Sequence, residues 1–229
     1  VEGFIYAKAN DIEDLRSKVD DSVCAIMFEY IQGEGGVVPL NRDFVDEIFK
    51  ICKEKDILAI ADEVQTGVGR TGTFLAGEQF GVRANITTLA KGLAGGVPIG
   101  VCLADEKCCD VLSKGTHGST FGGNPISCAG GMTVLERLSS GDFLAEVKQK
   151  GDYIKEKLLK IPEVAAVDGM GLMLGISLKT KKAPEVVQGA LENGLLLLTA
   201  KEKLRMLPPL TISYEEIDKG IAILEKLLK

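Results

Sequence analysis

Short apolar runs alternate with amphipathic segments over the first two-thirds of the chain, and this alternation is the feature that most constrains the fold. The apolar runs occupy residues 23–31, 57–63, 86–92 and 98–105. Between the first two, residues 41–56 carry apolar side chains at helical spacing, with Asn41 as a suitable N-cap. Buried strands separated by helices indicate a mainly parallel sheet, so this part of the chain is predicted to be α/β.

The pattern changes after residue 123. Two successive helices are predicted at 124–138 and 141–161, the second with its N-cap at Asp142. The remaining elements follow as strand candidates at 164–168, 171–178, 195–199 and 204–207, with helices at 184–193 and 214–228. This order of helices and strands predicts a smaller α+β domain. We place the boundary between the two domains near residue 140, giving 1–140 and 141–229.

Composition excludes several classes of function. The chain has 229 residues, of which 45% are hydrophobic and 26% are charged, as in globular proteins. A net charge of −6 and the lack of a basic run argue against nucleic-acid binding. The longest uncharged apolar stretch, residues 95–104, is too short to span a membrane. The cysteines form no C-x-x-C pair or zinc-ligand spacing, so we expect no metal site and a reduced, cytoplasmic setting.

Polar residues follow the predicted strands at three places. Asp62 and Glu63 end the run 57–63, Lys91 ends the run that begins at Ile86, and a glycine-rich polar loop covers 116–125. Open parallel sheets bind their ligands at the carboxyl ends of the strands. These residues are therefore the candidates for a functional site.

Lys91 has two interpretations. A single lysine at the end of an apolar strand is, as a rule, an exposed residue at the sheet edge. The glycines that follow Lys91 bring backbone close to it, and a desolvated lysine is a nucleophile suited to a Schiff base. Asp62, on a neighbouring strand end, could keep a pyridine nitrogen protonated, which is what pyridoxal phosphate chemistry requires.

A nucleotide hydrolase is the competing interpretation. An apolar strand that ends in Asp62 and Glu63 also suits a magnesium ion beside a phosphate chain. Such a site requires the motif G-x-x-x-x-G-K-[ST], and the dipeptide Gly-Lys does not occur in this chain. The motif could lie only outside these residues, so the pattern favours the pyridoxal phosphate interpretation.

Five segments together carry a resemblance to a known family. They are FEYIQGEGG, ADEVQTGVGRTGTF, TLAKGLAGGVPIG, HGSTFGGNP and LRMLPPLTIS, and they span nearly the whole chain. In order and spacing they resemble the class III (subgroup II) pyridoxal phosphate-dependent aminotransferases, most closely the acetylornithine aminotransferases. The resemblance implies the type I aminotransferase fold, with residues 1–140 as the C-terminal half of the cofactor-binding large domain and 141–229 as the small domain.

The resemblance also implies roles for individual residues. Lys91 would form the Schiff base with the cofactor and then move the proton, and Asp62 would pair with the pyridine nitrogen. Val64 would pack on the ring and Gln65 would approach its phenolic oxygen. Ser119 and Thr120 would reach the cofactor phosphate of the other subunit in a homodimer, where hydroxyl and backbone donors suit a dianion. Glu63 is expected to make a structural helix or turn contact, and His117 to be an ordinary loop residue.

Substrate binding is implied for three further residues. Arg205 matches the arginine that binds a substrate carboxylate, for which the guanidinium fork is suited. Glu34 would cover Arg205 while the amine donor is bound and withdraw for glutamate or 2-oxoglutarate. Glu29 would lie near the same network. Tyr30 departs from the family, which usually has proline there.

The reaction implied is transfer of the δ-amino group of N-acetylornithine to 2-oxoglutarate, as in arginine biosynthesis. Ornithine, succinylornithine and 4-aminobutyrate aminotransferases are the alternatives within the class. The chain resembles only the C-terminal part of the family, so the isolated chain is expected to be inactive. From a different class, a cofactor-free, non-catalytic fragment remains an alternative.

Overall fold

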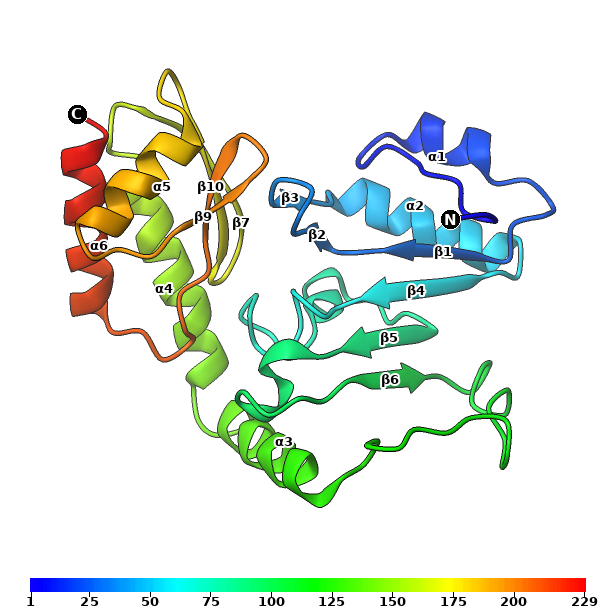
Figure 1. Ribbon diagram of the computed structural model, residues 1–229. Coiled ribbons are helices and arrows are strands. Elements are labelled where there is room, and N and C mark those ends of the chain that lie inside the picture. Colours follow the sequence, from blue (N-terminus) through cyan, green and yellow to red (C-terminus); the bar gives the residue numbers. More distant parts are fainter. The chain divides into compact units, whose positions relative to one another are not determined.

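The computed structural model describes all residues from 1 to 229 and divides them into two compact units (Figure 1). The first unit comprises Val1–Tyr30, Leu40–Gln65 and Ala76–Glu136, and the second comprises Ile31–Pro39, Thr66–Leu75 and Arg137–Lys229. Two short segments from the first half of the chain thus group with the C-terminal part. The domain boundary near residue 140 stays a prediction about the complete protein.

A four-stranded sheet forms the centre of the first unit. Its strands, in spatial order, are β1 (Ala25–Phe28), β4 (Leu58–Asp62), β5 (Ile86–Leu89) and β6 (Val101–Ala104). The first three are parallel, and β6 pairs antiparallel with β5. The α/β class with a mainly parallel sheet is confirmed.

Helix α2 (Arg42–Glu54) covers part of this sheet by its contacts with β1 and β4. The Asn41 side chain accepts a hydrogen bond from the backbone N–H of Phe44 at 2.8 Å and caps the helix as predicted. Phe44, Val45 and Ile48 are buried, at the spacing of one helical face. The apolar periodicity of the sequence therefore identifies the packed face of this helix.

One helix and one β-hairpin of the structure were not predicted. Helix α1 (Ile12–Lys18) has only seven residues, of which Leu15 alone is buried, and Asp11 caps it. Strands β2 (Ile31–Gln32) and β3 (Val38–Pro39) pair antiparallel as a hairpin around the turn that contains Glu34. Each of these strands has two residues, which is too short to display an alternating pattern.

The second unit is an antiparallel sheet with helices. Its strands, in spatial order, are β7 (Val164–Met170), β8 (Met173–Leu178), β10 (Lys203–Met206) and β9 (Leu198–Ala200). Its helices are α4 (Phe143–Leu158), α5 (Ala183–Glu192) and α6 (Tyr214–Leu227). Ser213 and Glu216 form a capping box on α6, whereas Asp142 occupies the N-cap position of α4 without a side-chain hydrogen bond. The predicted small α+β arrangement is present.

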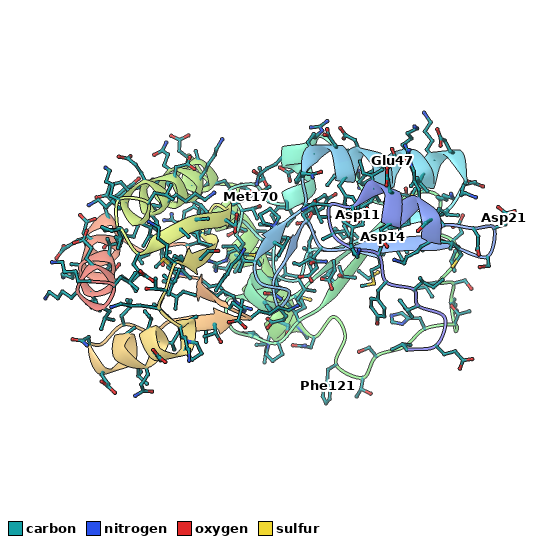
Figure 2. The ribbon with its side chains drawn as sticks, turned by 90° about the horizontal axis from the view of Figure 1, so that it is seen from above. Asp11, Asp14, Asp21, Glu47, Phe121 and Met170 are labelled. Carbon is teal, nitrogen blue, oxygen red and sulfur yellow. The ribbon has the colours of Figure 1, made fainter.

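The remaining helix, α3 (Pro125–Leu138), follows a long exposed loop. Phe121 projects from this loop and is 81% exposed (Figure 2). No helix in the structure combines the length and apolar character needed to cross a membrane. No three His, Cys, Asp or Glu side chains are grouped in a way that could hold a metal ion.

Candidate active site

Asp62 and Lys91 lie at the carboxyl ends of adjacent parallel strands. Asp62 is the last residue of β4 and pairs in register with Thr88 of β5. Lys91 comes shortly after the end of β5 and begins the 3₁₀ helix η2 (Lys91–Ala94). The register therefore brings a carboxylate and an amine to the same edge of the sheet, where such folds bind ligands.

Two hydrogen bonds hold the Asp62 carboxylate in place. Its Oδ1 atom accepts from the backbone N–H of Val64 at 3.0 Å and from the Thr88 hydroxyl at 3.3 Å. The first bond is local to the turn after β4, and the second crosses to the neighbouring strand. Thr88 is a member of this site that sequence reasoning missed, although its place opposite Asp62 in a parallel pair of strands could have identified it.

The backbone at Lys91 is strained. Its φ angle is 50°, in the left-handed region that residues other than glycine rarely adopt. Strain of this kind costs about 1–3 kcal/mol and is concentrated at functional sites. The side chain of Lys91 is exposed. The expected desolvation of the amine is therefore not present in this chain.

Glu63 has a structural role, as expected. It is only 2% exposed, and its carboxylate accepts hydrogen bonds from the backbone N–H groups of Ala76 at 2.6 Å and Gly77 at 3.1 Å. These groups begin the 3₁₀ helix η1 (Ala76–Phe80), whose first N–H groups lack partners within the helix. The two adjacent acids thus have different hydrogen-bond partners, because β4 ends between them and turns their side chains to different surroundings.

Tyr30 lies beside this structural contact. Its ring is 1% exposed and stacks on Phe80, with the ring centroids 5.2 Å apart. Burial, and to a smaller extent the nearby Glu63 carboxylate, raises the pKa of the Tyr30 hydroxyl well above its ordinary value. The departure from the family's usual proline is therefore accommodated as part of the core of the first unit.

The other residues expected to bind the cofactor lie in or next to the exposed surface of the first unit. Val64 and Gln65 are half-buried and follow Asp62 directly. Ser119 and Thr120 are exposed, and the Ser119 hydroxyl accepts a hydrogen bond from the N–H of Gly122 within its own loop. No hydrogen bond joins either of them to Asp62 or Lys91, so their contact with a cofactor phosphate stays a prediction.

Arg205 and Glu34 meet within the second unit. The Nη1 atom of Arg205 is 2.7 Å from Oε1 of Glu34. The arginine side chain is 11% exposed and the glutamate side chain 78%, so the acid lies on the solvent side of the pair. The Nε atom of Arg205 is buried without a hydrogen-bond partner. A carboxylate could satisfy that donor, and the role of Arg205 in substrate binding stays a prediction. Glu29, expected near this network, belongs to the first unit.

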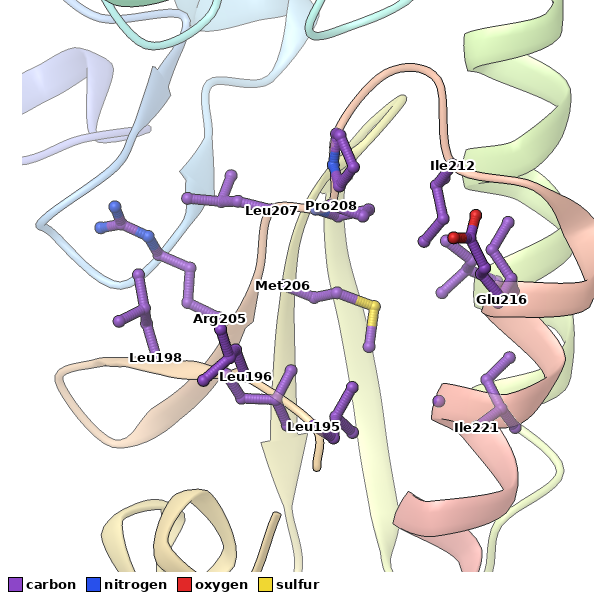
Figure 3. Close-up of a pocket in the computed structure, with 15 residues that line it drawn as sticks. Leu195, Leu196, Leu198, Arg205, Met206, Leu207, Pro208, Ile212, Glu216 and Ile221 are labelled. Carbon is purple, nitrogen blue, oxygen red and sulfur yellow. The ribbon is translucent and has the colours of Figure 1, made fainter. Parts of the chain in front are cut away.

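A separate apolar pocket of about 500 Å³ adjoins β10 and α6 in the second unit. Figure 3 shows that Met206 points into this pocket, whereas the guanidinium of Arg205 points to the other side of β10. The acid that lines the pocket, Glu216, is engaged in capping α6. Arg205 is among the residues that line the pocket, but its guanidinium points away, so the pocket interior is almost entirely apolar.

The donor set at the edge of the first unit fits pyridoxal phosphate. The primary amine of Lys91 after the end of β5 suits the cofactor's aldehyde, and a hydrogen-bonded carboxylate on the neighbouring strand end suits its ring nitrogen. Lys91 and Asp62 are the residues that would hold it. A nucleotide site would require the phosphate-binding loop that this chain lacks.

Comparison with known proteins points to the same chemistry. The profile of the family described as aminotransferase class-III matches residues 4–228. The acetylornithine aminotransferase of Haemophilus ducreyi is 45% identical over 228 residues, which are 99% of this chain and 58% of that protein. The acetylornithine aminotransferase of Aquifex aeolicus is 47% identical over 229 residues, which are 100% of this chain and 60% of that protein. The chain thus spans somewhat over half the length of these relatives.

Solved structures have the same fold. The N-acetylornithine aminotransferase of Stenotrophomonas maltophilia superimposes with a TM-score of 0.90 at 35% identity, covering 98% of this chain and 62% of that one. The ornithine aminotransferase of Toxoplasma gondii gives a TM-score of 0.92 at 32% identity, covering 100% of this chain and 56% of that one. The type I fold expected from the five segments is confirmed.

Proposed function

The chain belongs to the class-III aminotransferase family, whose enzymes depend on pyridoxal phosphate, and we propose that it forms part of an acetylornithine aminotransferase. The observation that carries this proposal is the placement of Asp62 and Lys91 at adjacent strand ends, within a chain that matches the family over almost its whole length. The protein would transfer the δ-amino group of N-acetylornithine to 2-oxoglutarate, giving N-acetylglutamate semialdehyde and glutamate.

The residues of the first unit would bind the cofactor and move the proton. Pyridoxal phosphate, when bound, supplies an electron sink for the substrate carbon. The Asp62 carboxylate would keep its ring nitrogen protonated, and Lys91 would carry the proton from one carbon to the other as a general base and acid. Val64 would pack against the ring and Gln65 would hydrogen-bond its phenolic oxygen, while Ser119 and Thr120 would contact the phosphate in a homodimer.

The residues of the second unit would select the substrates. Arg205 would bind a carboxylate of glutamate or 2-oxoglutarate, since its buried Nε offers a donor beside the Nη1 that Glu34 engages. Glu34 would cover Arg205 while the amine donor is bound and withdraw for glutamate or 2-oxoglutarate, because an unpaired guanidinium in a closed site is unfavourable. Glu29 would lie near this network. We propose a cytoplasmic location, as for a biosynthetic enzyme that acts on small molecules.

A panel of amine donors tests the proposed reaction. The full-length protein with pyridoxal phosphate is expected to use N-acetylornithine with the highest kcat/KM, when 2-oxoglutarate is the acceptor and glutamate formation is measured. Ornithine, succinylornithine and 4-aminobutyrate are the competing donors, and a higher kcat/KM for any of them would replace the acetylornithine assignment. Absence of transamination with every donor would favour the non-catalytic alternative.

Replacement of Asp62 by asparagine is expected to lower kcat by about a hundredfold or more, because an amide cannot stabilise a protonated ring nitrogen. Asparagine retains an oxygen that can accept from Val64 and Thr88, so the turn should be preserved. The rate would be measured in single-turnover absorbance experiments on the holoenzyme. A matched Asp110→Asn variant, in the exposed loop, should be unaffected, and a similar kcat for the Asp62 variant and the wild type would contradict the assignment.

A further inference from the structure

The turn that carries Glu34 rests on a glycine beside Arg205. Gly175 of β8 pairs directly with Arg205 of β10 in the antiparallel ladder. Residues that lie opposite one another in such a ladder project to the same face of the sheet. Because Gly175 has no side chain, that face has space immediately next to the arginine.

Val37 fills this space. A methyl group at position 175 would lie 2.6 Å from the Cβ atom of Val37, closer than two carbon atoms can approach, so the contact requires glycine. Val37 is 0% exposed and belongs to a buried cluster with Ile31, Met173 and Ala200. The hairpin of β2 and β3 is therefore fixed on the sheet at the position opposite Arg205.

The backbone conformation of Val37 shows that this packing contact outweighs the preference of valine for a negative φ angle. Its φ angle is 49°, a left-handed value that a β-branched residue adopts only under strain. The strain persists because the surrounding packing determines the position of the side chain. In the turn around Glu34, the backbone is buried at Gly33 and Gly36, but these glycines and Gly35 have no side chains to pack. Val37 is thus the anchor that brings Glu34 to Arg205.

We propose that Gly175 and Val37 are a pair of positioning residues that seat the Glu34 turn over Arg205 and so determine how the enzyme discriminates between its amine donor and the dicarboxylate substrates. This inference rests on the proposed function. With the pair in place, Glu34 covers the arginine at 2.7 Å and competes with an incoming carboxylate. With the pair disrupted, the turn moves away and Arg205 is open to glutamate.

The substitution Gly175→Ala tests the pair in the full-length holoenzyme. The clash with Val37 should displace the hairpin, so amide hydrogen exchange in residues 31–39 should become at least about tenfold faster. In single-turnover half-reactions the KM for glutamate should fall by about fivefold, the effect of removing one competing ion pair, while kcat stays unchanged. The kcat/KM for N-acetylornithine should fall. Glu34→Gln should reproduce the kinetic changes without the faster exchange.

Two further variants separate positioning from a general loss of structure. Val37→Gly/Gly175→Ala makes room for the new methyl group but lacks the buried valine side chain, so exchange in residues 31–39 should stay faster, and the KM for glutamate lower, than in the wild type. Gly220→Ala, a glycine of α6 where a methyl group meets only Leu195 at 3.4 Å, is the matched control and should leave both readouts unchanged. If Gly175→Ala does not fold, Val37→Gly alone should still speed exchange in the turn.

The inference is overturned if Gly175→Ala and Val37→Gly both leave exchange in residues 31–39 unchanged. It is also overturned if the turn loosens but the KM for glutamate does not fall, or if the double variant, which lacks the Val37 side chain, exchanges as slowly as the wild type. Hydrogen exchange reports on the turn whether or not the protein turns over. A wild-type protein without transaminase activity would therefore contradict the proposed function, and unchanged exchange would contradict the positioning pair.

Discussion

Replacing Lys91 with alanine is expected to abolish transamination, lowering kcat by about a thousandfold or more, because the substitution removes both the covalent anchor of the cofactor and the base that moves the proton. Each of these functions requires a primary amine at the edge of the sheet next to Asp62. The backbone strain at φ 50° should remain in the alanine variant, so the stability of the fold should change little.

The covalent role of Lys91 can be measured directly. After incubation of the full-length protein with pyridoxal phosphate and reduction with borohydride, peptide mass mapping is expected to find the pyridoxyl group on Lys91. Lys53→Ala, which removes an exposed lysine of α2, is the matched control and should retain both the label and the activity. A label scattered over surface lysines, or full activity in the Lys91 variant, would require the aminotransferase proposal to be withdrawn.

Replacing Gly151 with alanine is expected to destabilise the second unit by about 3 kcal/mol or more, since overpacking against backbone cannot be relieved by a side-chain movement. Gly151 lies inside helix α4, where helix propensity alone would favour alanine by about 1 kcal/mol. A methyl group there, however, would lie 2.2 Å from the carbonyl oxygen of Gly171, in the turn between β7 and β8. The substitution is therefore expected to lower the stability of the protein, whereas helix propensity alone predicts that it would raise it.

Urea denaturation followed by circular dichroism would measure this effect. Gly220→Ala in α6 is again the matched control, because its methyl group would make only an ordinary van der Waals contact. This variant should be as stable as the wild type or slightly more stable. If the Gly151 variant were as stable as the control, α4 and the turn after β7 would have to separate at little cost. The close approach would then have no part in holding the second unit together.

The sequence alone predicted the site residues that lie directly at the end of a strand. Asp62 and Lys91 each follow an apolar run, and the parallel arrangement inferred from those runs implies that both residues reach one edge of the sheet. The roles of Arg205, Glu34, Ser119 and Thr120 came instead from the resemblance to the family. For these residues the structure adds the Arg205–Glu34 contact, while the part played by Ser119 and Thr120 stays a prediction.

The partners across elements could not be predicted. Thr88 beside Asp62, and the two backbone N–H groups bound by Glu63, depend on which atoms the fold brings within 3.5 Å. The exposure of Lys91 was also unexpected, because a glycine-rich segment can either enclose a side chain or leave it uncovered.

The sequence by itself determined the class of fold, the helical face of α2 and the family, because apolar periodicity and contiguous motifs are properties of neighbouring residues. Only the tertiary structure decided that Gly175 lies opposite Arg205, and that Val37 adopts a left-handed conformation to pack there. It also decided that Gly151 must remain a glycine within a helix. These contacts join segments distant in sequence, and the side chains that fit them are chosen by the space between packed elements, which no local pattern records.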